Sequence, residues 1–297
     1  MNGRGELITI AIPTCNRREE LARCLASCRR WMPDARILVV DDGGDDGTRE
    51  MMQESFPWAG YLHYPENRGP AHARNRAIEA VDTPYVAFFD SDVRFLSDWC
   101  SAVRDRLSPD TVLAGRVQRP DGSLEWGPRK VMPWGGSRPC PPGEADVASS
   151  NNMLVPVEMA RLLGGFSENL GIYFEDTFFC IRALRAGFKV RYAGEAAVVH
   201  CHDSYLRPDR KRRFIRNRCR AMVSVAAKPR LMVMLQCMVT LGEMALAAAR
   251  GRSDIAKACW DGLLAGMRDV LSGLDAKRET GRSGSGPKGG PPAVRTI

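Results

Sequence analysis

The chain has 297 residues, 44% of them hydrophobic and 26% charged, which excludes a fibrous or wholly disordered protein and predicts one large folded domain with an appendage. Its net charge of +8 is concentrated in residues 207–220, where eight Lys and Arg residues stand against a single Asp. Such a block favours an anionic surface or a phosphate-bearing ligand over sequence-specific DNA, so we expect no nucleic acid partner. Ten scattered cysteines without a CxxC pair, and no apolar signal region in residues 1–6, predict a cytoplasmic protein.

The first hundred residues alternate between predicted strands and helices. Short runs rich in β-branched and aromatic residues predict strands at 7–13, 37–40, 61–64 and 85–89. Apolar residues at helical spacing predict helices at 18–32, 45–55 and 71–80. This alternation predicts an α/β fold with a mainly parallel central sheet and right-handed crossovers.

After Trp99 the pattern is looser. Residues 118–145 contain many Pro and Gly residues and are predicted to form an extended loop region. Order returns at 147–157, followed by helices at 157–163 and 174–186 and by strands at 189–192 and 196–199.

The C-terminal third has a different character. Residues 231–249 are long and apolar enough to suggest a membrane span, but Gln236, Thr240 and Glu243 form one polar stripe on a helix. The stripe favours a helix that lies on a membrane, on a partner or on the main domain over a true span. A second amphipathic helix is predicted at 254–274, and the low-complexity tail from Lys277 is predicted to be disordered.

Asp90-Ser91-Asp92 directly follows the strand predicted at 85–89. The carboxyl ends of strands are where open α/β sheets bind ligands. Two carboxylates one residue apart can hold a hard divalent cation and leave positions open for phosphate oxygens. Because an Asp-x-Asp triplet also occurs by chance, the buried strand in front of it is what makes this a candidate metal site.

Two further groups end a strand or begin a helix. Asp41 and Asp42 precede Gly43 and can accept hydrogen bonds from a nucleobase or a ribose, although Asp-Asp-Gly is also common in turns. Asn67-Arg68-Gly69-Pro70 and Arg74 bracket a helix N-terminus. Backbone amides and a guanidinium there suit phosphate, and the alternative is a solvated helix start.

Glu175-Asp176 begin the helix predicted at 174–186. Acids are normal in a first helical turn, and the functional alternative is a general base that faces an acceptor hydroxyl. His200 follows a predicted strand and either completes a cation site, contacts phosphate or is a buried structural histidine. His202 leaves the choice of ligand open.

In this order the motifs resemble those of the family-2 glycosyltransferases, which have the GT-A nucleotide-binding fold. The resemblance runs from Ile8 to about Arg220. The residues that carry it are Ile12-Pro13-Thr14-Cys15-Asn16-Arg17, Val39-Val40-Asp41-Asp42-Gly43, Asn67-Arg68-Gly69-Pro70-Ala71, Ala73-Arg74-Asn75, Phe88-Phe89-Asp90-Ser91-Asp92, Asn151-Asn152-Met153, Gly164-Gly165-Phe166, Phe174-Glu175-Asp176 with Arg182, and Val199-His200.

The resemblance implies an inverting transfer of one hexosyl or deoxyhexosyl unit from a UDP-, dTDP- or GDP-linked donor to a hydroxyl acceptor, in glycan or glycoconjugate biosynthesis. It implies that Asp176 is the base, supported by Glu175, and that Asp92 and His200 bind Mn²⁺ or Mg²⁺. Asp41 and Asp42 would lie near the nucleobase and Asp90 near the ribose. The residues it assigns to the donor are Pro13, Thr14, Asn16, Arg17, Asp41, Asp42, Asn67, Gly69, Arg74, Asp90 and Ser91.

Some features depart from the family pattern. The Gln-x-x-Arg-Trp signature of processive synthases is absent and no transmembrane bundle follows, so single-sugar addition is expected. Gly44 stands where the family often has Ser, and Asn217-Arg218 in the basic block are expected to touch diphosphate or lipid head groups. The alternatives are a sugar nucleotidyltransferase, disfavoured by the lack of a Gly-rich loop after the first strand, and a non-catalytic nucleotide-sugar-binding protein.

The predicted organisation is a GT-A-like catalytic domain at 1–205, a basic and amphipathic helical extension at 206–276 and a disordered tail at 277–297. Residues 207–274 are expected to make peripheral contact with the inner face of the membrane.

Overall fold

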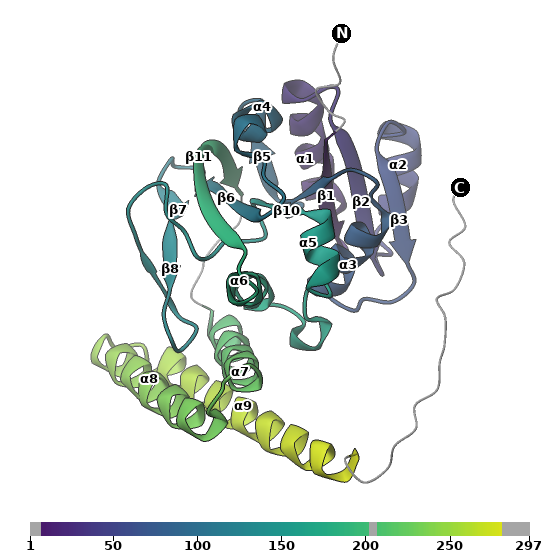
Figure 1. The fold of residues 1–297 in the computed structure, drawn as a ribbon. Coiled ribbons are helices and arrows are strands. Elements are labelled where there is room, and N and C mark those ends of the chain that lie inside the picture. The colour runs from purple at the N-terminus through teal and green to yellow at the C-terminus, as the bar shows by residue number, and fades with distance from the viewer. Residues whose placement is uncertain (1–6, 202–206, 281–297) are drawn as a thin grey trace.

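The computed structural model describes residues 7–201 and 207–280, in which a curled central sheet is flanked by helices and followed by a group of C-terminal helices (Figure 1). The α/β class predicted from the sequence is confirmed. The sheet runs in the order β3-β2-β1-β4-β10-β6-β11-β5, with β7 paired to β6.

The first half of the sheet is parallel. Its elements are β1 (Ile8–Thr14), α1 (Arg18–Trp31), β2 (Arg36–Asp42), α2 (Thr48–Ser55), β3 (Gly60–Tyr64), α3 (Pro70–Ala80) and β4 (Tyr85–Phe88). β1 pairs in parallel with both β2 and β4, and β2 pairs in parallel with β3. Ile10 and Ile12 lie in one apolar cluster and Ala11 in the other, so β1 is buried on both faces, which explains its continuous apolar run.

The second half of the sheet is mixed. Its elements are β5 (Val93–Phe95), α4 (Trp99–Val103), β6 (Thr111–Gln118), β7 (Leu124–Trp126), β10 (Met153–Pro156), α5 (Val157–Leu162), α6 (Glu175–Arg185) and β11 (Lys189–His200). β10 is antiparallel to β4 and β6, whereas β11 is parallel to β6 and antiparallel to β5. The hairpin of β8 (Arg129–Val131) and β9 (Ser137–Pro139) forms a separate small sheet.

Three expectations for this half are wrong in detail. The chain after Trp99 does not loosen, because β6 is a long buried strand inside the sheet. The segment at 118–145 contains the short strands β7, β8 and β9 besides its loops. The two late strands are one strand, β11, whose pairing with β6 shifts register between Ala193 and Ala197.

Three helices form the C-terminal extension: α7 (Pro208–Ser224), α8 (Pro229–Ala249) and α9 (Ser253–Thr280). In Figure 1, α7 lies between the sheet domain and the pair α8 and α9, which form one end of the molecule. α9 continues past the predicted boundary at 276, so residues 277–280 are helical and not part of a disordered tail. Residues 281–297 lie outside the described residues, and their disorder stays a prediction.

Candidate active site

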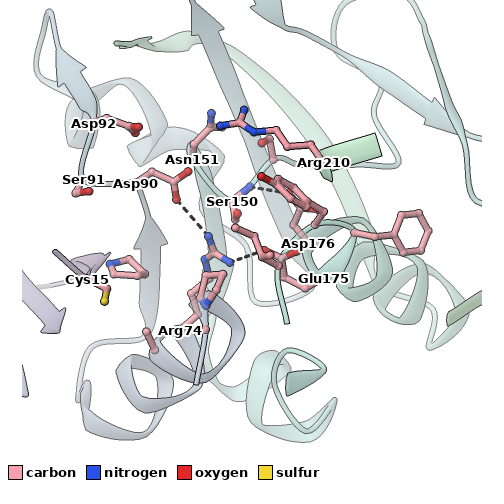
Figure 2. A pocket seen from close by; sticks show the side chains of 18 of the residues that line it. Cys15, Arg74, Asp90, Ser91, Asp92, Ser150, Asn151, Glu175, Asp176 and Arg210 are labelled. Atoms are coloured by element: carbon pink, nitrogen blue, oxygen red, sulfur yellow. Dashed lines mark hydrogen bonds and ion pairs between the residues drawn. The ribbon is translucent and has the colours of Figure 1, made fainter. Parts of the chain in front are cut away.

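A cavity of about 570 Å³ lies where the carboxyl ends of β1 and β4 face the N-termini of α6 and α7. Figure 2 shows side chains from these segments converging on it, with Asp90 and Asp92 on one side and Glu175 and Asp176 on another. Thirteen of the fifteen predicted site residues line it. They are Pro13, Thr14, Arg17, Asp42, Asn67, Gly69, Arg74, Asp90, Ser91, Asp92, Glu175, Asp176 and His200.

Asp90, Asp92 and His200 form a cluster of candidate metal ligands, with one ligand atom of each within 4.8 Å of the others. Sheet pairing brings them together, because β5 begins directly after Asp92 and pairs antiparallel with the end of β11. His200 therefore lies opposite Val93, and its Nε2 is 3.2 Å from Asp92 Oδ1. His202 lies outside the described residues, so the choice between the two histidines stays open.

Glu125 on β7 is a site residue that the sequence did not reveal. Its Oε1 lies 2.8 Å from Nδ1 of His200, which turns Nε2 toward Asp92. Burial alone would lower the pKa of His200, but the hydrogen bonds to Asp92 and Glu125 raise it to about 10. Burial would likewise raise the pKa of Asp92, but His200 and Arg17 lower it to about 2. The only signal for Glu125 in the sequence is an acid within a Pro- and Gly-rich segment.

The cluster fits a divalent cation in its donor chemistry. Two carboxylates and one imidazole are oxygen and nitrogen ligands of the kind that Mn²⁺ accepts, and carboxylates also suit Mg²⁺. Asp92 and His200 are almost fully buried, whereas the Asp90 side chain is 40% exposed toward the cavity. A carboxylate that holds His200 by Nδ1 is also the usual partner of a metal-binding histidine.

Arg74 connects the two acidic sides of the cavity. Its side chain is 3% exposed and comes from α3. One guanidinium nitrogen lies 2.8 Å from Glu175 Oε1 and the other 3.2 Å from Asp90 Oδ1, as the dashed lines in Figure 2 show. The alternative of a solvated helix start is therefore excluded for Arg74, which is a buried residue of the cavity wall.

Glu175 and Asp176 begin α6, and the backbone before them is unusual. Tyr173 and Phe174 both have positive φ angles, 72° and 76°, a conformation that non-glycine residues rarely adopt and that often accompanies functional sites. The turn directs both acids into the cavity. Asp176 accepts hydrogen bonds from the amides of Ser150 (3.2 Å) and Thr177 (2.5 Å).

The two neighbouring acids differ in environment. Glu175 is buried and paired with Arg74, while Asp176 is partly exposed. Burial and the charge of Asp176 raise the pKa of Glu175 to about 7 against the opposing effect of Arg74. Burial also raises the pKa of Asp176. Of the two, Asp176 is the one whose carboxylate is more accessible to a second substrate.

Asp41 and Asp42 are both buried, and they hold the neighbouring backbone in place. Asp42 lines the cavity, and its Oδ2 accepts hydrogen bonds from the amides of Arg68 (2.8 Å) and Gly69 (2.6 Å). Asp41 does not line it, because its carboxylate accepts from the Tyr61 hydroxyl (2.6 Å) and the Gly44 amide. Asn16, with φ 52°, also lies outside the lining and accepts from the amide of Asp45. Direct donor contact by these side chains stays a prediction.

The extension contributes to the cavity through α7, since Arg210, Lys211 and Phe214 line it. These residues belong to the basic block at 207–220, for which the sequence predicts an anionic surface or a phosphate-bearing ligand as partner. The expectation for Asn217 and Arg218 is wrong, because both are buried and bonded to the protein itself. Asn217 donates to carbonyl oxygens of residues 170, 172 and 173, and so fixes the segment that precedes α6.

Comparison with known proteins agrees with this geometry. A family model described as Glycosyl transferase family 2 matches residues 9–187. A pre-mycofactocin glycosyltransferase of Mycobacterium tuberculosis is 29% identical over 221 residues, which cover 67% of this chain and 44% of that protein. Glycosyltransferase AglE of Haloferax volcanii is 25% identical over 215 residues, which cover 66% of this chain and 67% of that protein. The chain thus spans less than half the length of the mycobacterial relative.

Solved structures share the fold at low sequence identity. The mannosyltransferase PcManGT of Pyrobaculum calidifontis, in complex with GDP-Man and Mn²⁺, has a TM-score of 0.60 at 14% identity and covers 88% of this chain and 87% of that one. S. aureus TarS (residues 1–349) with UDP-GlcNAc has a TM-score of 0.54 at 15% identity and covers 77% and 70%. The family model matches more than half of the residues, and the motif order and the fold agree with it. This chain therefore belongs to glycosyl transferase family 2.

Proposed function

We propose that the protein transfers a single sugar from a nucleotide-diphosphate sugar to a hydroxyl acceptor, with a divalent cation and with inversion at the anomeric carbon. The observation that carries this proposal is that Asp92 and His200 share one cavity with Asp176. A cation site and a carboxylate base facing the same cavity are what one in-line displacement requires. The names of the relatives and of the solved structures, with GDP-Man or UDP-GlcNAc bound, support a nucleotide-sugar donor.

The proposed step forms a bond between the acceptor oxygen and the anomeric carbon while the bond from that carbon to the diphosphate oxygen breaks. Asp176 takes the proton of the acceptor hydroxyl, and Glu175 with Arg74 holds the beginning of α6 in place. Asp92 and His200 would hold Mn²⁺ or Mg²⁺, with Asp90 beside them, and such an ion neutralises the departing diphosphate when bound. The positively charged side chains of Arg210 and Lys211 of α7, which line the cavity, would favour an anionic ligand.

The base assignment is tested with Asp176→Asn, which keeps the shape of the side chain and one of its two hydrogen-bond acceptors but removes its basicity. A panel of UDP-, dTDP- and GDP-sugars, screened by cation-dependent thermal stabilisation, first identifies the donor. We then expect the variant to bind that donor with unchanged affinity. Its transfer rate should fall at least about a thousandfold, which is within the range of rate losses that follow the removal of a general base.

Asp105→Asn is the matched control, because Asp105 is exposed and lies outside the cavity lining. Transfer by the Asp176→Asn protein at the rate of this control would remove the base assignment. A panel without any cation-dependent donor would remove the proposed function as a whole.

We also propose that the protein acts in the cytoplasm with peripheral contact on the inner face of the membrane, through residues 207–274. The support is the apolar composition of α8 together with the basic residues of α7.

A further inference from the structure

The polar stripe of α8 faces inward. Gln236 and Thr240 are fully buried, and both accept hydrogen bonds from Arg218 of α7, at 3.1 Å each. Glu243 completes the stripe, with its Oε1 2.6 Å from the same guanidinium. The amide of Gln236 donates in turn to the carbonyl of Trp134 in the β8–β9 hairpin, at 2.8 Å. α8 is therefore fixed to the protein by the very residues that make it amphipathic.

The opposite side of α8 is exposed and wholly apolar. The exposed residues between 231 and 249 are Leu231, Met234, Met238, Leu241, Gly242, Ala245, Leu246, Ala248 and Ala249. The five large ones among them are 50–68% exposed. Glu243 is the one charged residue in this stretch, and it is paired with Arg218 and Lys211. A continuous apolar surface of this kind marks an interaction site, since soluble surfaces rarely leave one uncovered.

α9 also exposes apolar and basic residues in turn. Lys257, Trp260, Leu264, Arg268 and Leu271 follow each other at spacings of three and four, so they lie on one side of the helix, and all are exposed. Among the acids of α9, Asp269 pairs with Arg216 and Asp254 with Arg252, whereas the half-buried Asp261 follows Trp260 directly. Tryptophan and long basic side chains are typical of the boundary between lipid tails and head groups.

The ends of α8 are basic as well. Exposed Lys228 and Arg230 precede its apolar run, and exposed Arg250 follows it. We name the exposed apolar residues of α8 together with Trp260, Leu264 and Leu271 of α9 the outer face. The outer face is apolar, has basic residues around it and has no exposed acid on α8. It is therefore complementary to a partner whose interior is apolar and whose boundary with water is anionic.

We propose that the outer face docks on an anionic lipid bilayer, with α8 and α9 lying in the plane of the head groups. The position of these helices at one end of the molecule, with α7 behind them, leaves the outer face accessible (Figure 1). The proposal names the outer face as the surface that carries the peripheral contact. In the basic block of α7, Arg216, Arg218 and Arg220 are engaged with the protein itself.

The same geometry argues against a span. Within the part of the chain that the structure describes, α8 alone is long and apolar enough to cross a membrane. Crossing would pull Gln236, Thr240 and Glu243 away from Arg218, which is 1% exposed. A buried guanidinium without its partners costs several kcal/mol, so the docked arrangement is favoured.

The test is cosedimentation of the full-length protein with phosphatidylcholine vesicles. The vesicles are prepared with and without about 30% of the anionic lipid phosphatidylglycerol. We expect binding to the anionic vesicles that weakens with salt. Replacing Leu231, Met234, Met238 and Leu241 by Ser should weaken it at least tenfold, and Lys257→Gln with Arg268→Gln should reduce its salt dependence. The control is Leu162→Ser on α5, where the apolar residue is even more exposed (76%), and this variant should bind as the unaltered protein does.

Several outcomes would overturn the proposal. Equal binding by the Ser variant and the control would show that lipid contacts lie elsewhere. If light scattering shows that the unaltered protein and the control are dimers and the Ser variant is a monomer, a second copy of the chain is the occupant of the outer face. Release from vesicles by detergent alone, and not by salt or alkaline wash, would indicate a span. Circular dichroism and melting temperature show whether the Ser variant is folded, and binding is measured without substrate, so a failure here is distinct from a failure of the proposed transfer.

Discussion

The guanidinium of Arg74 lies 2.8 Å from the carboxylate of Glu175, and this ion pair joins residues 101 positions apart in the sequence. Both side chains are about 95% buried or more. Arg74 comes from the parallel half of the fold, and Glu175 comes from the helix that carries the proposed base. The pair therefore fixes the side of the cavity that carries Asp90 relative to the side formed by α6.

Removing Arg74 should be costly because it leaves a buried carboxylate without its partner. We expect Arg74→Met to lower the free energy of unfolding by about 3–5 kcal/mol, measured by urea denaturation at pH 8. The double variant with Glu175→Gln should recover part of this loss, which a double-mutant cycle quantifies. Arg23→Met, which breaks an exposed pair with Glu19, should change stability by less than about 1 kcal/mol. Equal losses for the two single variants would contradict a special role of the buried pair.

The pair of acids in α6 should give the reaction an acid limb near neutral pH. The pKa of Glu175 is raised to about 7 and that of Asp176 is also raised, so protonation of the pair begins at higher pH than for ordinary carboxyls. Because a base must be ionised, kcat/KM should fall as the pH decreases through about 7. The measurement is a rate profile from pH 5 to 9, with cation binding checked at each pH. A rate that stays constant down to pH 5 would mean that neither acid acts as a base.

Glu125 should act on cation binding through His200. Glu125→Gln keeps the size of the side chain but weakens its hold on Nδ1 of the imidazole. We expect Mn²⁺ affinity, measured by titration with electron paramagnetic resonance, to fall about 10- to 100-fold, as is typical for partners of metal-binding histidines. Glu195→Gln, which alters an exposed ion pair with Arg106, serves as the control. Unchanged Mn²⁺ affinity would leave Glu125 without this positioning role.

The motif Gly164-Gly165-Phe166 should be needed for packing, and its two glycines allow a matched comparison. Both have positive φ angles, 71° and 68°, but a side chain on Gly164 meets open space whereas one on Gly165 meets the Asn75 amide. Asn75 makes two hydrogen bonds to the backbone of Phe166. Gly164→Ala should therefore cost about 1–2 kcal/mol and Gly165→Ala clearly more, by calorimetry. Similar melting temperatures for the two variants would exclude the proposed clash.

The sequence predicted the parallel half of the sheet well, because each strand there is a continuous apolar run that ends in a polar turn. β6 was missed since Gly115 interrupts its apolar pattern. That glycine is needed because a side chain there would meet Asn152, which also accepts a hydrogen bond from Trp99. β11 was divided in two because Gly194 and Glu195 coincide with its register shift. Tertiary contacts of this kind leave no periodic pattern in the sequence.

The candidate site was predicted where acids follow strands and was missed where short strands or other helices bring residues in. Glu125 lies on a strand of three residues, too short for a pattern. The orientation of α8 depends on Arg218, a residue that looked like part of a solvated basic block. The sequence shows that a polar stripe exists, but only the packing of α7 against α8 shows which way it faces.

α7 has a double position in the fold, since one side of it borders the cavity and another holds the polar stripe of α8. Lys211 belongs to both, because it lines the cavity and lies 2.8 Å from Glu243. If the protein docks on a membrane as proposed, any accompanying adjustment of α7 would alter the cavity in which we propose that the nucleotide sugar binds. Thermodynamic reciprocity then requires that the lipid surface and the donor alter each other's affinity by the same factor.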